Sequence, residues 1–456
     1  MPREELADLR RSLALLDGAL MRLLAERIHL TRRLAQTGEP RTVVENVAGL
    51  EAQAEAVGLR SAFARQLWSL LDYEASMPQR PPSPSAVLSD AICRIESSGI
   101  RRAFDLGAKL TNPINFSIGQ PDFAVPQAVI EAAHRAIDEG LNKYTPTQGL
   151  ELLRVKVAQK LARENGIQVQ PDDVLITSGT SGGIFLALAA ILNPGDELVL
   201  PDPYFVMYPQ LAGFLGARPV LVDTYPDFRL DPQKIEAALS PRTKAIVINS
   251  PSNPTGAVYS EAELREVVRI AERRGLLLIS DEIYERFIYD DIRPFSPGSI
   301  YPNTITLNGF SKSHALTGWR VGYAVGPQPI IEKMKELQQY TFVCAPSFAQ
   351  VAAAVALDTP TDAEIAAYRR KRDLIYEGLR RCFEVTKPAG AFYIMPKVDD
   401  TDCTRFVERA IERNVITVPG GVFSARNTHV RISFATSDEA IRAGVEILCE
   451  LKRELG

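Results

Sequence analysis

Residues 308–320 read N-G-F-S-K-S-H-A-L-T-G-W-R, which places Lys312 between two serines and sets Arg320 eight residues further on. A lysine amine becomes able to form a Schiff base once desolvation or a nearby cation lowers its pKa. Arg320 is a candidate for that cation and for a phosphate ligand, and Ser311 is a candidate hydroxyl donor to the same phosphate. By itself, the stretch also fits a solvated lysine in a serine-rich loop.

Three further stretches decide between these interpretations, because they occur in the order that one enzyme family has. They read N-S-P-S-N-P-T-G at residues 249–256, S-D-E-I-Y at residues 280–284 and H-V-R-I-S-F at residues 429–434. Together with residues 308–320 they resemble class I aminotransferases, the fold-type I enzymes that use pyridoxal phosphate (PLP). The resemblance covers most of the chain. It implies the α/β PLP-dependent transferase fold, with Lys312 as the catalytic residue that binds the cofactor covalently.

Length and composition limit the possible classes of protein. The chain has 456 residues, enough for two or three domains. Its net charge of −4 gives no sign of a nucleic-acid partner, and neither a membrane span nor a secretory signal is predicted. The cysteines are odd in number and widely spaced, which predicts neither a disulfide framework nor a metal site and favours a reducing, cytoplasmic compartment. They are Cys93, Cys344, Cys382, Cys403 and Cys449.

Residues 1–78 contain almost no strand signal and are expected to form an all-α, three-helix domain. Leucines recur at three- and four-residue steps from Leu9 to Leu34, which predicts one long amphipathic helix. Two shorter helical stretches follow, near residues 43–57 and 61–75. The order of a long, a short and a medium helix resembles the all-helical chorismate mutases.

Arg10 and Arg27 match two arginines that bind the substrate's carboxylates in the mutase family. Elsewhere the match fails, because Gly38 stands where the family has a catalytic lysine. The chemistry needs cations that face a dianionic substrate, so we expect a degenerate domain with weak or no mutase activity. It would assist dimerisation or bind a metabolite of the aromatic pathway. The alternative is a plain helical dimerisation arm with solvated arginines, while the balanced charge argues against a DNA-binding head.

A linker and a large α/β body follow this domain. Residues 79–86 are rich in proline and serine and predict a semi-rigid linker. Helical and strand patterns then alternate over residues 87–456, which predicts a mostly parallel sheet. The resemblance divides this body into a major domain, about residues 126–350, and a smaller α+β domain made of residues 87–125 and 351–456. The predicted strands are 174–177, 197–200, 218–222, 245–249, 276–280, 304–308, 322–325, 391–395 and 429–434, and helices are predicted at 182–192 and 260–274.

The cofactor's ring needs a carboxylate at the pyridine nitrogen and hydrogen-bond donors to the ring oxygen. Asp281 directly follows the apolar strand 276–280, where α/β folds place ligand groups, and the resemblance assigns it the pyridine nitrogen. Tyr284 and Asn253 are the expected donors to the ring oxygen. Considered alone, the Asn-Pro-Thr-Gly sequence that begins at Asn253 is more typical of a simple turn.

The phosphate cradle is expected where a glycine-rich loop leads into a helix, because free backbone N–H groups at a helix start bind phosphate. Its expected members are Gly179, Thr180, Ser181, Ser311 and Arg320. Tyr204 matches the aromatic residue that stacks on the pyridine ring in the family. Tyr144 matches a tyrosine that family members lend to the partner subunit's phosphate. The resemblance therefore implies a homodimer with shared active sites.

Two further residues are expected at the substrate. Arg431 matches the arginine that holds the substrate's α-carboxylate, which a guanidinium does in a bidentate manner. Gly119 matches a glycine that lets the backbone approach the substrate. The resemblance implies ping-pong transamination between an amino acid and a 2-keto acid, with Lys312 as general base and acid.

The substrate is inferred less directly. The mutase-like segment favours an aromatic keto acid, such as phenylpyruvate or 4-hydroxyphenylpyruvate, or prephenate, the product of a mutase. Some relatives that use aspartate or prephenate carry a basic residue at the position of Ser181, so this serine argues against a dicarboxylate bound in that manner. Alternatives are an aspartate- or alanine-type aminotransferase with a dimerising or regulatory head, a PLP-dependent C–S lyase, and a regulator without catalytic activity. Intact Lys312, Asp281 and Arg431 argue against the regulator.

Overall fold

The computed structural model of the chain describes residues 17, 20–30, 60, 66–67, 70–71, 88–95, 99–100 and 110–455. The chain divides into two units, Met1–Leu88 and Ser89–Gly456. In the first unit residues 20–30 form a helix, within the segment where the leucine spacing predicts one, and Arg27 lies half-buried on it. Arg10 and the predicted linker 79–86 lie outside the described residues.

The larger unit is built around a seven-stranded sheet with the order β2-β8-β7-β6-β5-β3-β4. Within this sheet β8 alone runs antiparallel to its neighbours β2 and β7, so the predicted mostly parallel sheet is confirmed. Each predicted strand of this sheet begins and ends within two residues of an observed one. The strands are β2 (Leu175–Ser178), β3 (Glu197–Asp202), β4 (Arg218–Asp223), β5 (Thr243–Asn249), β6 (Leu277–Asp281), β7 (Thr304–Gly309) and β8 (Val321–Val325).

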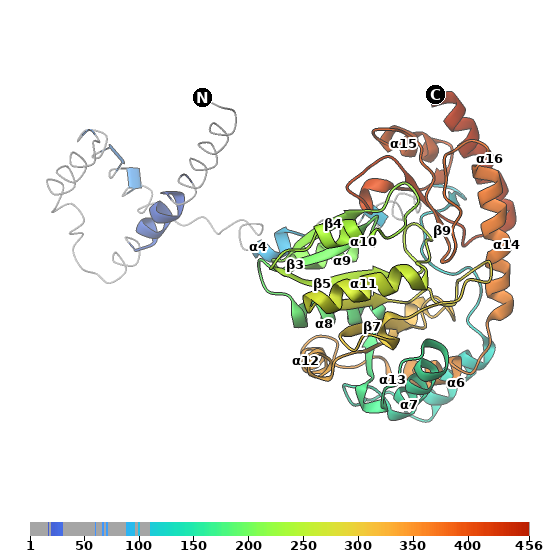
Figure 1. Cartoon of the computed structure of the whole chain (residues 1–456), viewed down its shortest axis with the longest axis horizontal. Helices are drawn as coiled ribbons and strands as arrows, with labels where there is room; N and C mark the ends of the chain where they lie inside the picture. Colours follow the sequence, from blue (N-terminus) through green and yellow to red (C-terminus); the bar gives the residue numbers. More distant parts are fainter. Residues whose placement is uncertain are drawn as a thin grey trace. The chain divides into compact units, whose positions relative to one another are not determined.

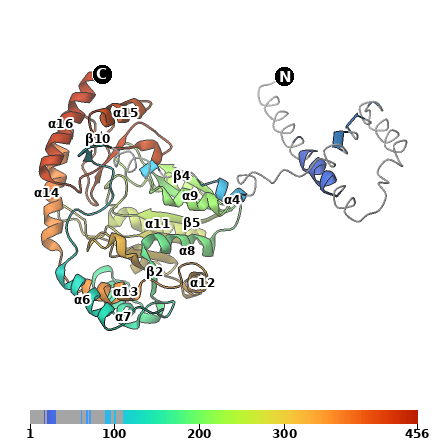
Figure 2. The same cartoon turned by 180° about the vertical axis from the view of Figure 1, so that it is seen from behind.

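Helices cover both faces of this sheet, which is why its strands are apolar on both sides. One face carries α8 (Gly179–Ile191), α9 (Met207–Phe214) and α12 (Gln328–Gln339). The opposite face carries α10 (Pro232–Ala237), α11 (Glu261–Arg274), α6 (Gln127–Asp138), α7 (Glu151–Lys160) and α13 (Ser347–Ala356). Figure 1 shows α11 in front of the sheet. Figure 2 views the molecule from the opposite side and shows α8 in front of the sheet. None of the described helices combines the length and the apolar character that a membrane crossing requires.

Local sequence signals set the ends of α11. At its start the Ser260 side chain accepts the N–H of Glu263, and the Glu263 carboxylate accepts the N–H of Ser260 in return. At its end Gly275 adopts a left-handed conformation with φ of 63°, which glycine tolerates without strain. The helix predicted at residues 260–274 is thereby confirmed.

A second layer of the larger unit combines two small sheets with three helices. β9 (Tyr393–Ile394), β12 (Val430–Ser433) and β11 (Val418–Pro419) form an antiparallel sheet, and β1 (Ile114–Asn115) pairs with β10 (Val415–Ile416) in parallel. The helices are α14 (Asp362–Leu379), α15 (Thr404–Glu412) and α16 (Asp438–Leu455). α14 and α16 lie side by side along one flank (Figure 1). α13 packs on α6 and α7.

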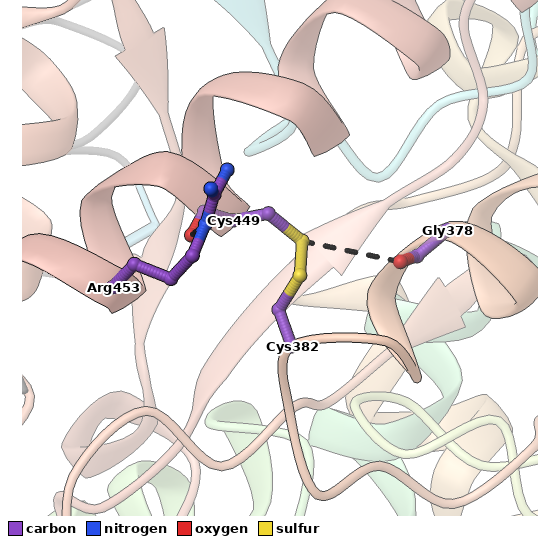
Figure 3. Close-up of a disulfide and its surroundings, with 4 residues drawn as sticks. All are labelled: Gly378, Cys382, Cys449 and Arg453. Carbon is purple, nitrogen blue, oxygen red and sulfur yellow. Dashed lines mark hydrogen bonds between the residues drawn. A yellow bond between two sulfur atoms is a disulfide. The ribbon is translucent and has the colours of Figure 1, made fainter.

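A disulfide joins Cys382, just beyond α14, to Cys449 on α16 (Figure 3). The two Cα atoms lie 5.5 Å apart although 67 residues separate the cysteines along the chain. This pair corrects the expectation of no disulfide. Spacing in the sequence gave no hint of it, because the packing of α14 on α16 brings the two thiols together.

Candidate active site

The predicted cofactor residues lie at one edge of the large sheet, where three neighbouring parallel strands end. Asn249 and Asp281 are register partners at the ends of β5 and β6. Lys312 follows β7, the next strand in the sheet. The carboxyl ends of parallel strands are the usual ligand edge of an α/β sheet, so strand order alone brings these side chains together.

A cavity of about 430 Å³ opens at this edge. Most of the predicted site residues line it, namely Gly119, Thr180, Ser181, Asn253, Asp281, Tyr284, Ser311, Lys312, Arg320 and Arg431. Among its described lining residues three are cations and one, Asp281, is an anion. A cavity with this charge balance favours an anionic ligand.

Lys312 is half-buried, and its ammonium donates a hydrogen bond of 2.6 Å to the backbone carbonyl of Gly119. Burial, followed by the nearby charges of Arg431 and Arg320, lowers the pKa of this lysine to about 8. The structure therefore supports the predicted activation of the amine by desolvation and by Arg320, and it adds Arg431 as a second cation.

Asp281 is held by groups that fix both oxygens of its carboxylate. The Tyr208 hydroxyl on α9 donates to Oδ2 at 2.6 Å, and the backbone N–H of Ile283 donates to Oδ1 at 3.2 Å. The Asn249 amide donates to the Asp281 backbone carbonyl at 3.0 Å. Burial raises the pKa of Asp281 to about 6, against the effect of these hydrogen bonds. A carboxylate in this setting gains from a cationic partner, such as a protonated pyridine nitrogen.

Arg431 on β12 is 1% exposed, yet it forms no ion pair within the described residues. Its Nη1 and Nη2 atoms donate to the Asn253 side chain at 3.0 Å and to the Ser117 carbonyl at 2.7 Å. Its Nε atom finds no partner in the described part of the chain. A buried cation without an anion is costly, so the site is suited to an incoming carboxylate.

The start of α8 has the features of a phosphate cradle. The buried Thr180 hydroxyl has no hydrogen-bond partner among the described residues. Gly179 adopts φ of +65°, and a Cβ at this position would lie 2.5 Å from Nη2 of Arg320. The glycine therefore lets the guanidinium approach the first turn of the helix, whose N–H groups lack partners within the helix. With Ser311, which also lines the cavity, these residues fit the phosphate of PLP.

Three predicted residues do not line the cavity. Gly179 lies behind Arg320. Tyr204 borders a smaller neighbouring pocket, and its neighbour Phe205 lines the cavity in its place. Tyr144 is 85% exposed at the surface of the chain.

Sequence reasoning missed Tyr208, Phe205 and Tyr393. Phe205 directly follows Tyr204 in the sequence but was not among the predicted residues. Tyr208 and Tyr393 are buried aromatic residues with no motif of their own. Their position in the site depends on packing, and no signal in this one sequence distinguishes them from core residues.

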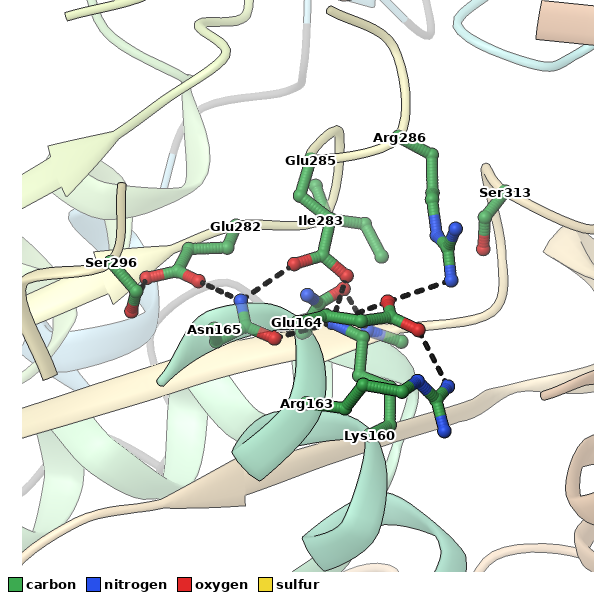
Figure 4. A network of polar contacts seen from close by, with 12 residues as sticks. Lys160, Arg163, Glu164, Asn165, Glu282, Ile283, Glu285, Arg286, Ser296 and Ser313 are labelled. Atoms are coloured by element: carbon green, nitrogen blue, oxygen red, sulfur yellow. Dashed lines mark hydrogen bonds and ion pairs between the residues drawn. The ribbon is translucent and has the colours of Figure 1, made fainter. Parts of the chain in front are cut away.

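Glu282, the residue after Asp281, belongs to a buried polar network (Figure 4). The Glu282 carboxylate accepts hydrogen bonds from Ser280 at 2.8 Å, from Ser296 at 2.6 Å and from Asn165 at 3.1 Å. Burial, followed by the charge of Glu285, raises the pKa of Glu282 to about 7. These hydrogen bonds fix Glu282, which directly follows Asp281 at the end of β6, and so help to hold Asp281 in position.

A half-buried lysine of lowered pKa, a held carboxylate and an anion cradle at the carboxyl edge of this sheet define a PLP enzyme of the aminotransferase kind. The family described as "Aminotransferase class I and II" matches residues 111–448. The chain belongs to this family and is a PLP-dependent aminotransferase.

Relatives of known name support the assignment. The chain is 41% identical over 358 residues to an aspartate/prephenate aminotransferase of Thermus thermophilus, which covers 76% of the chain and 92% of that protein. It is 38% identical over 383 residues to aromatic-amino-acid aminotransferase 2 of Thermococcus litoralis, which covers 80% of the chain and 98% of that protein. An aromatic aminotransferase structure from Pyrococcus horikoshii matches with a TM-score of 0.73 at 37% identity, covering 78% of the chain and 99% of that structure.

Proposed function

We propose that this aminotransferase exchanges amino groups between an amino acid and an aromatic 2-keto acid. The observation that carries the proposal is the cavity itself. Its described cations are Lys312, Arg320 and Arg431, and each has a place in the binding of cofactor or α-carboxylate. No described lining cation is left for a second carboxylate on the substrate's side chain.

We assign the cofactor's contacts to the residues predicted from the sequence, with one change. Asp281 would hold the pyridine nitrogen, Tyr284 and Asn253 the ring oxygen, and Phe205, in place of Tyr204, would stack on the ring. Thr180, Ser181, Ser311 and Arg320 would hold the phosphate, and Gly179 would leave room for Arg320 to do so. When bound, PLP supplies an electron sink that makes the substrate's Cα–H acidic.

The chain's own residues then position the substrate and move its proton. Arg431 binds the α-carboxylate and thereby fixes the Cα–H relative to Lys312. Once its amine is displaced by the substrate, Lys312 is neutral for much of the time near pH 8, since its pKa is lowered to about 8. It can therefore accept the Cα proton and return it as general acid.

The wall around these groups favours an apolar side chain on the substrate. Ile100, Ile118, Phe205 and Val206 line the cavity, and Ser181 stands where a basic residue is found in some dicarboxylate-using relatives. Aromatic keto acids fit this wall. Prephenate remains the sharper alternative, because four of the compared relatives carry prephenate in their names.

A half-reaction assay tests the substrate. The PLP form is mixed with single amino acids, and its absorbance reports conversion to the amine form, which is then offered phenylpyruvate, prephenate and 2-oxoglutarate separately. We expect aromatic amino acids and phenylpyruvate to react fastest. Preference for aspartate and prephenate over phenylalanine and phenylpyruvate would reject the monocarboxylate assignment. Release of pyruvate and ammonia without an acceptor would instead indicate a lyase.

We further propose a homodimer whose subunits exchange Tyr144. The loop at residues 141–147 meets the end of α12, where Gln338 donates a hydrogen bond of 2.7 Å to the Thr147 carbonyl. Together they expose Tyr144 and Tyr340, which are 85% and 86% exposed. Such an aromatic surface is typical of an interface.

Mixing two variants, each of which lacks one residue of the shared site, tests whether Tyr144 serves the partner subunit. Tyr144→Phe and Lys312→Ala subunits are refolded together, because a mixed dimer would then contain one site with both native residues. We expect activity above that of either variant alone. If the mixture is no more active than the Tyr144→Phe protein, Tyr144 does not serve the partner's site.

For residues 1–78 we propose a mutase-like domain of weak or no activity that binds an aromatic-pathway metabolite. Its support is the match of Arg10 and Arg27 to carboxylate-binding arginines. A binding measurement with prephenate and chorismate on the full chain and on an Arg27→Ala variant tests it. Equal affinity of both proteins would favour the plain dimerisation arm.

A further inference from the structure

Tyr393 on β9 contacts three functional groups of the site although no motif contains it. Its ring is 1% exposed and lines the cavity. β9 pairs with β12, the strand that carries Arg431, and Tyr393 is the register partner of Ser433. The guanidinium carbon of Arg431 lies 4.6 Å from the centroid of the Tyr393 ring, within the range of a cation–π contact.

The hydroxyl of Tyr393 forms a hydrogen bond of 2.8 Å with the hydroxyl of Tyr284. Burial raises the pKa of both phenols, so both keep their protons in the neutral range. One proton lies between the two oxygens, and the other remains available. If Tyr393 is the donor, the Tyr284 proton is free to point at the cofactor's ring oxygen.

Gly119 makes room for this hydroxyl. A Cβ on Gly119 would lie 2.5 Å from the Tyr393 oxygen, which is too close for two atoms without a bond. The next atom of the ring, Cζ, would lie at 3.6 Å, an ordinary contact distance. The backbone of Gly119 is not in the left-handed region, so space and not φ requires the glycine. The same residue accepts the hydrogen bond from Lys312.

We propose that Tyr393 is a positioning residue that donates to Tyr284 and so directs the Tyr284 proton toward the ring oxygen of the bound cofactor. Gly119 is the residue that leaves space for this donor. The inference rests on the proposed cofactor contact of Tyr284. It adds to that contact a specific reason for both Tyr393 and Gly119.

Absorbance of the holoenzyme over a pH series tests the hydrogen bond directly. A donor to the ring oxygen draws charge from it and disfavours protonation of the neighbouring Lys312 nitrogen, so losing the donor raises the pKa of the chromophore. We expect Tyr284→Phe to raise it clearly and Tyr393→Phe to raise it by about half a pH unit, as for one neutral hydrogen bond. Tyr301→Phe, which removes a buried hydroxyl bonded at 2.6 Å to the Leu276 carbonyl, is the matched control and should not shift it.

The double variant makes the test specific. Tyr284→Phe with Tyr393→Phe should titrate like Tyr284→Phe alone, because Tyr393 acts through Tyr284. A Tyr393→Phe protein that titrates like the wild type would overturn the proposal, and so would shifts that simply add.

A second cycle tests the space at Gly119. Gly119→Ala should weaken cofactor binding and raise the KM for the amino acid in the wild-type background. In the Tyr393→Phe background the same change should have little effect, because the clashing oxygen is gone. Equal losses in both backgrounds would show that Tyr393 does not set the need for glycine.

Failure of the proposed function would look different. If no amino acid converts the wild-type holoenzyme to the amine form, the transamination assignment fails, while the pH titration still reports on Tyr393. If aromatic substrates react but Tyr393→Phe titrates like the wild type, this inference alone fails.

Discussion

Replacing Tyr208 by phenylalanine removes one buried hydroxyl that donates to Asp281 at 2.6 Å and leaves the ring in place. The bond favours the ionised carboxylate, which is the form that a protonated pyridine nitrogen requires. We therefore expect the variant to bind PLP more weakly, with a loss that depends on pH. The loss arises because the empty protein must give up a proton from Asp281 before the cofactor is held.

The magnitude follows from the pKa of Asp281, which burial raises to about 6 in the wild type. A hydrogen bond to a charged group stabilises the ionised form by about 2 kcal/mol, which corresponds to about 1.5 pKa units. The pKa of Asp281 in the variant would therefore be about 7.5. More of the variant's Asp281 is then neutral than in the wild type, and the neutral carboxyl must first lose its proton. The variant should therefore bind PLP about 4-fold more weakly than the wild type at pH 7, about 16-fold more weakly at pH 6 and almost equally at pH 8.5.

Fluorescence titration of the apoprotein with PLP at these three pH values measures the ratio of dissociation constants. Because the ionisations of PLP and Lys312 are common to both proteins, they cancel in the ratio. Tyr301→Phe, which removes a buried hydroxyl bonded to the Leu276 carbonyl just before β6, should leave the ratio near one. An equal loss at pH 6 and pH 8.5, or no loss at all, would refute the reasoning.

Three other changes have outcomes that the structure sets. The rate at which PLP becomes attached to Lys312 should increase with pH, with the midpoint of the increase near pH 8, because only the neutral amine reacts and its pKa is about 8. Stopped-flow absorbance, with Lys312→Ala as the blank, would measure this rate. The pKa of Glu282 is about 7 in the folded protein and lower in the unfolded chain, so the wild type loses stability as pH rises from 4.5 to 7. Glu282→Gln lacks this carboxyl, and its free energy of unfolding should therefore gain about 3 kcal/mol relative to the wild type over that range. An equal difference between the two proteins at both pH values, measured by denaturant titration, would contradict this. Reduction of the Cys382–Cys449 bond, which spans 67 residues, should lower the free energy of unfolding by about 4 kcal/mol. Denaturant titration with and without reductant checks it, and Cys449→Ser should be insensitive to reductant.

The sequence by itself determined the sheet and most of the site. Each strand is a short apolar run, and Asp281 directly follows one of them, so its place at the carboxyl edge followed from local pattern. Asn253, Asp281, Lys312 and Arg431 each lie in one of four ordered motifs whose chemistry is specific to one cofactor. These features depend on neighbouring residues in the chain, which a single sequence displays.

Tertiary structure alone decided which side chains support these groups. Tyr208 reaches Asp281 across 73 residues, and Tyr393 reaches Tyr284 across 109 residues. Phe205 faces the cavity and Tyr204 does not, because the turn after β3 sets which of two adjacent aromatics points inward. The disulfide between Cys382 and Cys449 likewise depends on how α14 packs on α16. Long-range contacts of this kind arise from packing, and packing leaves no periodic or local signature in the sequence.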